Sequence, residues 1–205
     1  MNKLQTTFSR LLGKVQNANT PKYIIVHCSA ISTKVSNNQF VSINNNHKQR
    51  DFPMSSLGYY IGYHYLLTND REYQCRLDTD EGAHCNQSRD GLSINFQSIG
   101  ICWSGDGDNE MPSENYRQLL QKRIWAIQDK YNIPNWNVYY HHFFAINKTC
   151  AGTMLNNQYL ADLLKRPSNP QLTEPCVSAN DVIIKQQEQI SVLQKVIDYL
   201  SSLIK

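Results

Sequence analysis

Long apolar runs are missing from this 205-residue sequence, and so is a strong excess of charge of either sign. No stretch approaches the roughly 18 consecutive apolar residues that a membrane-spanning helix needs. Twenty basic residues stand against 17 acidic ones, and the lysines and arginines are scattered rather than gathered into a stripe. The composition therefore argues against a transmembrane segment and against a nucleic-acid partner, because phosphate backbones are bound by clustered basic side chains.

The N-terminal segment also lacks the features of a secretory signal peptide. Residues 1–20 carry a few positive charges but no continuous apolar core and no small-residue cleavage site. We therefore expect a protein that is made in a cytoplasm and stays there. Leu4, Phe8, Leu11 and Val15 recur at helical spacing. This spacing is typical of an amphipathic helix that rests on a membrane or a partner, or of one that packs on its own domain.

Six cysteines would suit a disulfide framework only in a smaller, exported chain. Free thiols are therefore the expectation, with a Cys75–Cys85 disulfide as the alternative if their strands are neighbours. Cys28 and Cys102 lie in apolar runs and are expected to be small core residues. Cys150 differs, because it lies in a polar loop close to two histidines.

Strand and helix patterns alternate along residues 21–166 and predict a single α/β domain with a central mixed β-sheet flanked by helices. Runs of β-forming residues predict strands within residues 21–30, 62–67, 71–77, 96–105 and 137–142. Apolar spacing predicts helices over residues 114–131, where Ser113 is the capping residue, and over residues 154–165. Residues 37–50 are weakly helical at best.

The C-terminal region follows different rules. Residues 167–179 are rich in proline and have almost no periodicity, which is typical of a linker. Over residues 180–205, isoleucine recurs every seven residues and leucine fills the positions between, which predicts a C-terminal heptad helix that pairs in a coiled coil. We keep two hypotheses for this helix: a homo-oligomer that it joins, and docking on its own domain.

Three side chains that zinc accepts as ligands lie where a fold can bring them together. His27 ends one predicted strand, His142 ends another, and Cys150 follows eight residues later. Because successive side chains of a strand point to opposite faces, His27 can reach a site while Cys28 enters the core. Two imidazoles and a thiolate leave one tetrahedral position of zinc for water, as catalysis requires. The spacing alone also fits a core histidine and a buried cysteine, which are commoner than ligands.

Five short motifs carry a resemblance to a known family. They are IIVHCSA (24–30), GYHYLLTNDREYQCR (62–76), GAHC (82–85), SIGICWSGDGD (98–108) and HHFFAINKTC (141–150). In order and rough spacing the chain resembles the zinc-dependent N-acetylmuramoyl-L-alanine amidases, most of all phage lysozyme-type endolysins of the amidase and peptidoglycan-recognition superfamily. The resemblance implies a Zn²⁺ cofactor and cleavage of the amide bond between N-acetylmuramic acid and L-alanine in bacterial peptidoglycan.

Carried over residue by residue, the resemblance implies three zinc ligands, His27, His142 and Cys150. His141 is the rival of His142, because a one-residue slip in the loop would exchange the two. The turn after the cysteine departs from the family pattern. The usual Cys-Pro-Gly is Cys-Ala-Gly here, so the turn has lost a proline that would stiffen it.

The resemblance also assigns polar groups to catalysis and substrate binding. Tyr63 and Lys148 match the family's catalytic tyrosine and lysine, which implies an active enzyme and not one of the superfamily's zinc-less binding members. Tyr63 would orient the water or donate to the intermediate, and Lys148 would stabilise the oxyanion. His84 in GAHC matches a position near the cleft and is interpreted as a substrate contact.

Several function hypotheses follow. The first is a phage endolysin that waits in the host cytoplasm and reaches the cell wall at lysis through a holin. A bacterial toxin or remodelling enzyme exported by another route is an alternative to the phage origin. A peptidoglycan-binding module that retains zinc without turnover is the main alternative of another class, and a zinc hydrolase that acts on a different amide is the third.

Overall fold

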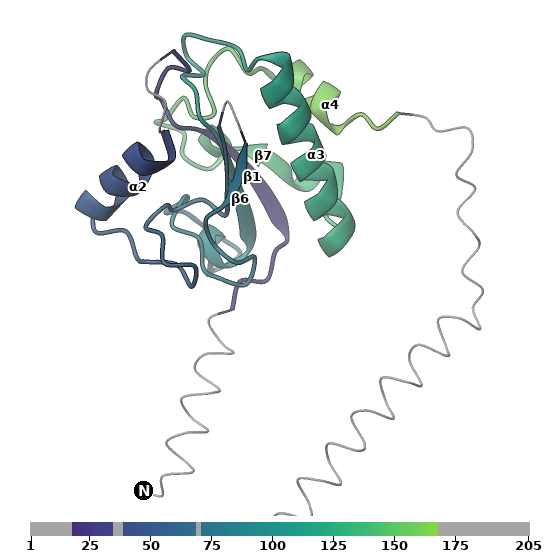
Figure 1. The fold of residues 1–205 in the computed structure, drawn as a ribbon. Helices are drawn as coiled ribbons and strands as arrows, with labels where there is room; N and C mark the ends of the chain where they lie inside the picture. Colours follow the sequence, from purple (N-terminus) through teal and green to yellow (C-terminus); the bar gives the residue numbers. More distant parts are fainter. Residues whose placement is uncertain (1–17, 35–38, 69–70, 168–205) are drawn as a thin grey trace, which may run out of the picture. The chain divides into compact units, whose positions relative to one another are not determined.

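The computed structural model describes residues 18–34, 39–68 and 71–167 (Figure 1). The described helices and strands all lie in one unit of the chain, Met1–Lys165. The expected N-terminal amphipathic segment, the linker and the heptad helix lie wholly or almost wholly outside the described residues, and they stay predictions. None of the described helices combines the length and the apolar character that crossing a bilayer requires.

A five-stranded mixed sheet in the order β3-β2-β6-β1-β7 forms the centre of this unit. The strands, in chain order, are β1 (Tyr23–Cys28), β2 (Tyr65–Leu67), β3 (Glu72–Gln74), β4 (Ser88–Arg89), β5 (Leu92–Ser93), β6 (Ser98–Trp103) and β7 (Val138–Tyr140). In this sheet the pairs β2–β6, β6–β1 and β1–β7 are parallel, and β3 is antiparallel to β2. The short strands β4 and β5 pair separately as a two-stranded ribbon.

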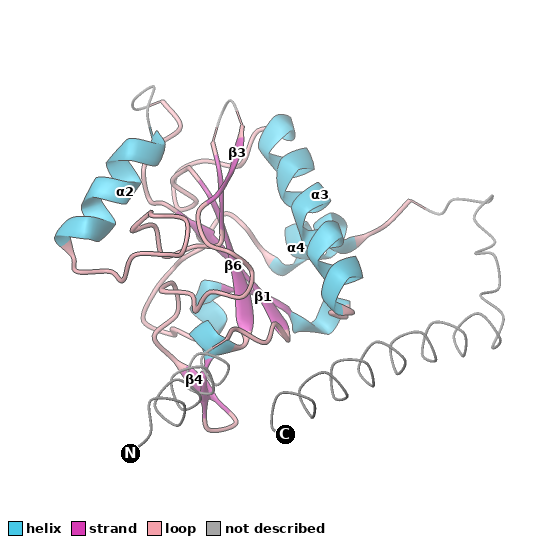
Figure 2. Cartoon of the chain, turned by 60° about the horizontal axis from the view of Figure 1, so that its bottom comes forward, coloured by secondary structure: helices cyan, strands magenta, loops and turns pink. Residues whose placement is uncertain are grey.

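Helices cover both faces of the sheet (Figure 2). They are α2 (Gln39–Gln49), α3 (Glu114–Tyr131) and α4 (Asn157–Leu164), with the 3₁₀ turns η1 (Ile94–Phe96), η2 (Asn135–Asn137) and η3 (His141–Phe143). The main core lies under α3 and α4, where Ile99, Ile101 and Trp103 of β6 are fully buried. Cys102 faces the opposite core under α2. The prediction of one α/β domain with a mixed sheet and flanking helices is therefore confirmed.

The two longer helices show why one was easier to predict. α3 spans the predicted residues, and the Ser113 hydroxyl caps it by accepting from the Tyr116 N–H. The side chains that α2 buries are Gln39, Ile43 and His47, which are spaced as on a helix but are mostly polar. Such a stripe has almost no hydrophobic periodicity, so the weak helical signal of residues 37–50 underestimated α2.

All five cysteines in the described part of the chain carry free thiols. Cys28 and Cys102 are buried, as expected of small core residues. Cys75 and Cys85 pack in different apolar clusters, one beside α2 and the other beside η1. The structure therefore does not bring the alternative disulfide together.

Candidate metal centre and active site

Three side chains with metal-binding atoms meet where β1 and β7 end. The donor atoms of His27, His141 and Cys150 all lie within 4.8 Å of one another. His27 Nδ1 is 3.6 Å from Cys150 Sγ, and the ring centroids of His27 and His141 are 4.5 Å apart. β1 and β7 are parallel neighbours, so their carboxyl ends meet at the same edge of the sheet. This pairing brings together residues that are far apart in the sequence.

The chemistry of this donor set fits zinc. Zinc binds imidazole nitrogen at about 2.0–2.1 Å and thiolate at about 2.3 Å, so tetrahedral coordination places N and S about 3.5 Å apart. The His27 Nδ1–Cys150 Sγ distance is 3.6 Å. Burial lowers the pKa of His27 well below 6.5 and that of His141 to about 4, so both imidazoles are neutral at pH 7 and can coordinate a metal. The Cys28 N–H donates to Cys150 Sγ over 3.3 Å, a contact that favours thiolate.

His142, the predicted second ligand, lies outside this cluster, and its place is taken by His141. β7 ends at Tyr140, two residues earlier than predicted, and the tight turn of η3 begins at once. The turn brings the buried His141 ring to His27. His142 instead contacts the Cys150 carbonyl, through its backbone N–H at 2.6 Å and its Nδ1 at 3.1 Å. The structure thus favours the rival, His141, as the candidate second ligand, because spacing to the cysteine does not reveal where the strand stops.

The loop that carries Cys150 is fastened to the loop after β6. The Asp108 carboxylate accepts from the Thr149 hydroxyl at 2.6 Å and from the Thr153 N–H at 2.8 Å. Gly107 and Gly152 pack backbone against backbone, and Gly152 has a φ of +114°, which glycine adopts readily. These contacts hold the turn that lacks the family's proline.

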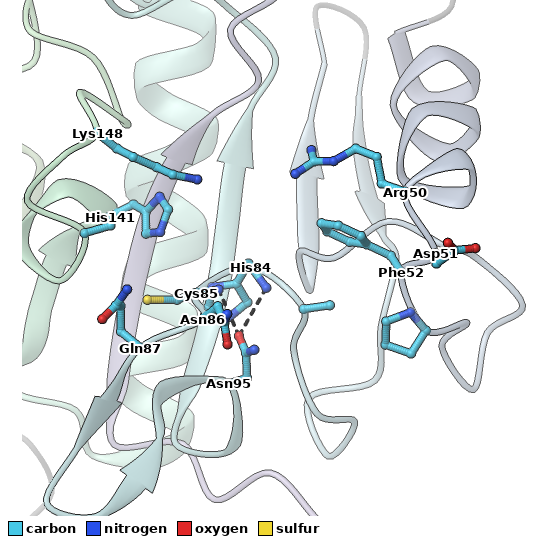
Figure 3. A pocket seen from close by; sticks show the side chains of 13 residues that line it. Arg50, Asp51, Phe52, His84, Cys85, Asn86, Gln87, Asn95, His141 and Lys148 are labelled. Carbon is cyan, nitrogen blue, oxygen red and sulfur yellow. Dashed lines mark hydrogen bonds between the residues drawn. The ribbon is translucent and has the colours of Figure 1, made fainter.

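A pocket of about 190 Å³ contains the cluster and adjoins a larger one of about 460 Å³. The residues that line both are Arg50, Phe52, Ala83, His84, His141 and Lys148. Figure 3 shows the larger pocket, with the Arg50 and Lys148 side chains reaching toward each other from opposite walls. The opening therefore has a cationic group on each side, with the candidate metal ligands beside it.

Tyr63 and Lys148, the predicted catalytic residues, both line the smaller pocket. The Tyr63 ring centroid is 5.0 Å from that of His27. Burial, helped by the Cys102 and Cys150 sulfurs, raises the pKa of Tyr63 well above 10, so its hydroxyl keeps its proton and is a hydrogen-bond donor. Lys148 is exposed and brings its charge to the rim.

His84, the predicted substrate contact, lines both pockets, but its ring nitrogens have protein partners. Its Nδ1 is 3.0 Å from His27 Nε2, and its Nε2 is 3.4 Å from Ser98 Oγ. Burial lowers the pKa of His84 well below 6.5, so the ring is neutral at pH 7. Substrate binding by His84 stays a prediction, whereas its contact with a candidate ligand is direct.

Sequence reasoning missed the pocket residues that α2 and the following loop supply. His47 accepts a hydrogen bond from the Gly62 N–H at 3.0 Å and stacks on Phe52, with ring centroids 4.4 Å apart. It therefore supports the segment that leads into Tyr63. Arg50 follows directly after α2 and lines both pockets. The helical spacing of the buried side chains of α2 was a signal for His47, but not for Arg50, which lies beyond the helix.

Comparison with solved structures supports the fold. Residues covering 72% of this chain superpose on 88% of the N-acetylmuramoyl-L-alanine amidase LysC from Clostridium intestinale URNW, at 22% identity and a TM-score of 0.56. The Ph2119 endolysin from the Thermus scotoductus MAT2119 bacteriophage matches at 21% identity and a TM-score of 0.53, over 72% of this chain and 87% of its own. The ectodomain complex of peptidoglycan recognition proteins LCa and LCx bound to tracheal cytotoxin matches at 22% identity and a TM-score of 0.52. The match covers 67% of this chain and 80% of the other chain.

No curated protein matches the chain significantly by sequence. The family model of N-acetylmuramoyl-L-alanine amidases, however, matches residues 17–153, which is more than half of the chain. This stretch includes His27, His141 and Cys150 and ends where the Cys150 loop ends. The resemblance seen in the five motifs is thereby confirmed, and the chain belongs to the N-acetylmuramoyl-L-alanine amidase family.

Proposed function

We propose that the chain is a phage endolysin that cleaves the amide bond between N-acetylmuramic acid and L-alanine of bacterial peptidoglycan with the help of zinc. The observation that carries the proposal is the convergence of His27, His141 and Cys150 in a pocket that also contains Tyr63 and Lys148. Membership of the amidase family supports the reaction, and the donor set supports the metal.

In this proposal His27, His141 and Cys150 would hold the ion, and all three side chains line the smaller pocket. A zinc ion held by these residues would lower the pKa of a bound water toward about 7 and would polarise the scissile carbonyl. The His27 and His141 side chains are both buried, so their rings are largely shielded from bulk water. Three protein ligands with one open position distinguish a catalytic zinc site from a structural one.

Tyr63 and Lys148 act on the charge that develops on the carbonyl oxygen. The Lys148 ammonium reaches the pocket from its rim, where it can approach the oxyanion without being buried beforehand. The Tyr63 hydroxyl keeps its proton and can donate to the water or to the tetrahedral intermediate. Arg50, on the opposite wall, supplies a second cation suited to the carboxylates of a stem peptide.

The ligand assignment gives the first prediction. Cys150→Ser and His141→Ala are expected to lose both zinc and activity, because a hydroxyl is a far poorer ligand than a thiolate and a methyl group is none. His142→Ala is the matched control, since it removes the neighbouring imidazole, and it should retain most of the zinc. Metal content per chain and dye release from labelled sacculi are the two measurements.

The same measurements separate the alternatives. Full zinc occupancy in Cys150→Ser, or loss of zinc in His142→Ala but not in His141→Ala, would overturn the ligand set. Binding of sacculi without dye release by the zinc-loaded wild type would favour the binding module. Turnover that survives removal of the metal by a chelator would contradict the zinc mechanism.

A further inference from the structure

A chain of buried polar groups leads away from His27 on the side opposite Cys150. His27 Nε2 lies 3.0 Å from His84 Nδ1, and His84 Nε2 lies 3.4 Å from the Ser98 hydroxyl. The Ser98 hydroxyl in turn donates to the Ile94 carbonyl oxygen over 2.7 Å. All three side chains are buried. The chain therefore connects a candidate metal ligand to the backbone of η1.

The carbonyl at the end of this chain fixes the direction of every hydrogen bond in it. A carbonyl oxygen only accepts, so the single Ser98 hydroxyl hydrogen is committed to Ile94. Ser98 Oγ must then accept from His84, which places the His84 hydrogen on Nε2. A neutral imidazole has only one hydrogen, so His84 Nδ1 is an acceptor and the facing Nε2 of His27 is the donor.

This direction leaves the lone pair of His27 on Nδ1. Nδ1 is the atom that lies 3.6 Å from Cys150 Sγ, on the side of the cluster. We propose that His84 and Ser98 are positioning residues that hold His27 in its Nε2–H tautomer and so present Nδ1 to the metal. The purpose of this arrangement rests on the proposed zinc site, whereas the hydrogen-bond chain is a property of the protein itself.

The fold keeps the His84 ring in this place. A Cβ added to Gly82 would lie 2.5 Å from the ring, and one added to Gly100 would lie 2.6 Å from it, so the ring packs against bare backbone at two points. The backbone N–H groups of His84 and Cys85 both donate to Asn95 Oδ1, at 3.1 and 2.9 Å (Figure 3). A ring enclosed in this way is suited to orienting a neighbour.

The group that accepts the Nε2–H of His27 is an unusual partner for a metal ligand. Ligating histidines commonly donate their second N–H to a carboxylate, a backbone carbonyl or water. Here the acceptor is the neutral imidazole of His84. Its Nδ1 is a donor in one tautomer and an acceptor in the other, and the hydrogen bond with Ser98 determines which tautomer forms. Loss of the Ser98 hydroxyl should therefore affect His27, although the two side chains are not in contact through any described hydrogen bond.

Histidine tautomers can be read directly by ¹⁵N–¹H NMR of the full-length protein. We expect both His84 and His27 to carry their hydrogen on Nε2 in the metal-free protein, and His84 to keep it there when zinc is added. A His84 that carries its hydrogen on Nδ1 would overturn the proposal. Because this reading needs no metal, it tests the hydrogen-bond chain even if the wild type fails to bind zinc, a result that would contradict the proposed function instead.

Zinc affinity, measured by competition with a chromophoric chelator, gives the second reading. His84→Leu is expected to weaken zinc binding by about 10- to 100-fold, and His84→Asn, which retains an acceptor, should recover part of that loss. Ser98→Ala should weaken binding in the same direction. Ser104→Ala is the matched control, because this buried hydroxyl has no hydrogen-bond partner within the described residues. Wild-type affinity in a folded His84→Leu protein would overturn the proposal.

Discussion

Tyr63 and Lys148 contribute to the pocket in physically different ways. Tyr63 is half-buried with its ring against His27, and its hydroxyl stays protonated over the whole working range of pH. Lys148 is exposed, so its charge is screened by solvent until a substrate covers the pocket. Neither residue belongs to the donor cluster, and in the proposed mechanism both act on the reacting groups without holding the ion.

We therefore expect Tyr63→Phe and Lys148→Ala to keep zinc but to lower turnover by about 100-fold or more, the size of effect seen when one oxyanion-stabilising donor is removed. Hydrolysis of soluble muropeptides, followed together with metal content, is the measurement. Lys148→Arg preserves the charge and serves as the control that should recover part of the rate. Wild-type turnover in both of the first two variants would leave the metal as the sole catalytic group.

Residues of the site could be predicted from the sequence where they belong to one of the five motifs. His27, Cys150, Tyr63 and Lys148 all reach the pocket, as the motifs implied. The sequence left the choice between the adjacent histidines open, because it depends on the backbone turn at His141, which no local pattern reveals. Arg50 and Phe52 were missed for a different reason: they line the pocket only because α2 packs over the sheet, and that packing is a property of the whole fold.

At the scale of elements, the loop after β6 and the Cys150 loop are in close contact, and a substitution that disrupts this contact should lower the free energy of unfolding. A Cβ at Gly152 would overlap the Gly107 backbone, and the residue also has a positive φ. Gly152→Ala is expected to lower the free energy of unfolding by on the order of 3 kcal/mol, from overpacking and backbone strain together. Denaturant unfolding of the metal-free protein measures this change without a contribution from the ion.

Gly91 provides the matched control for that variant. Its φ is +77°, but an added Cβ would meet nothing within 4 Å. Gly91→Ala should therefore show the backbone strain alone, about 1 kcal/mol. Equal losses in the two variants would mean that the contact between the loops contributes nothing beyond the conformation of glycine.

The elements themselves were predictable where their signals are local. α3 combines a capping serine with an apolar stripe, so both its start and its end followed from the sequence. β7 was predicted too long because His141 and His142 continue a run of β-forming residues, while the chain turns into η3. α2 was underestimated because two of the three side chains it buries are polar, and their burial depends on partners elsewhere, such as Gly62 for His47.

For the molecule as a whole, buried histidines predict sensitivity to acid. Burial, the largest cause in each case, lowers the pKa of His47, His64 and His141 to about 4 from 6.5. Between pH 6.5 and 4 the unfolded chain therefore binds more protons than the folded one, so stability falls as pH falls. The slope is at most about 1.4 kcal/mol per pH unit for each histidine.

We expect the metal-free protein to have a lower free energy of unfolding at pH 5 than at pH 7, measured by urea titration at each pH. The metal-free form is needed because an ion would change the titration of His141. His47→Asn should flatten the profile, since it removes one of the three titrating groups while keeping an acceptor for Gly62. A free energy of unfolding that is constant from pH 7 to 5 would contradict the burial of neutral imidazoles.

The place of β7 in the sheet has a consequence for how long an ion would stay bound. β7 is an edge strand of the described sheet and pairs with β1 through three residues. His141 and Cys150 follow this strand in the chain, whereas His27 lies on the interior strand β1, which also pairs with β6. Detachment of the edge would separate two donors from the third while β1 and β6 stay paired. Metal exchange is therefore expected to follow local unfolding of this edge, and the bound ion would in turn suppress that opening.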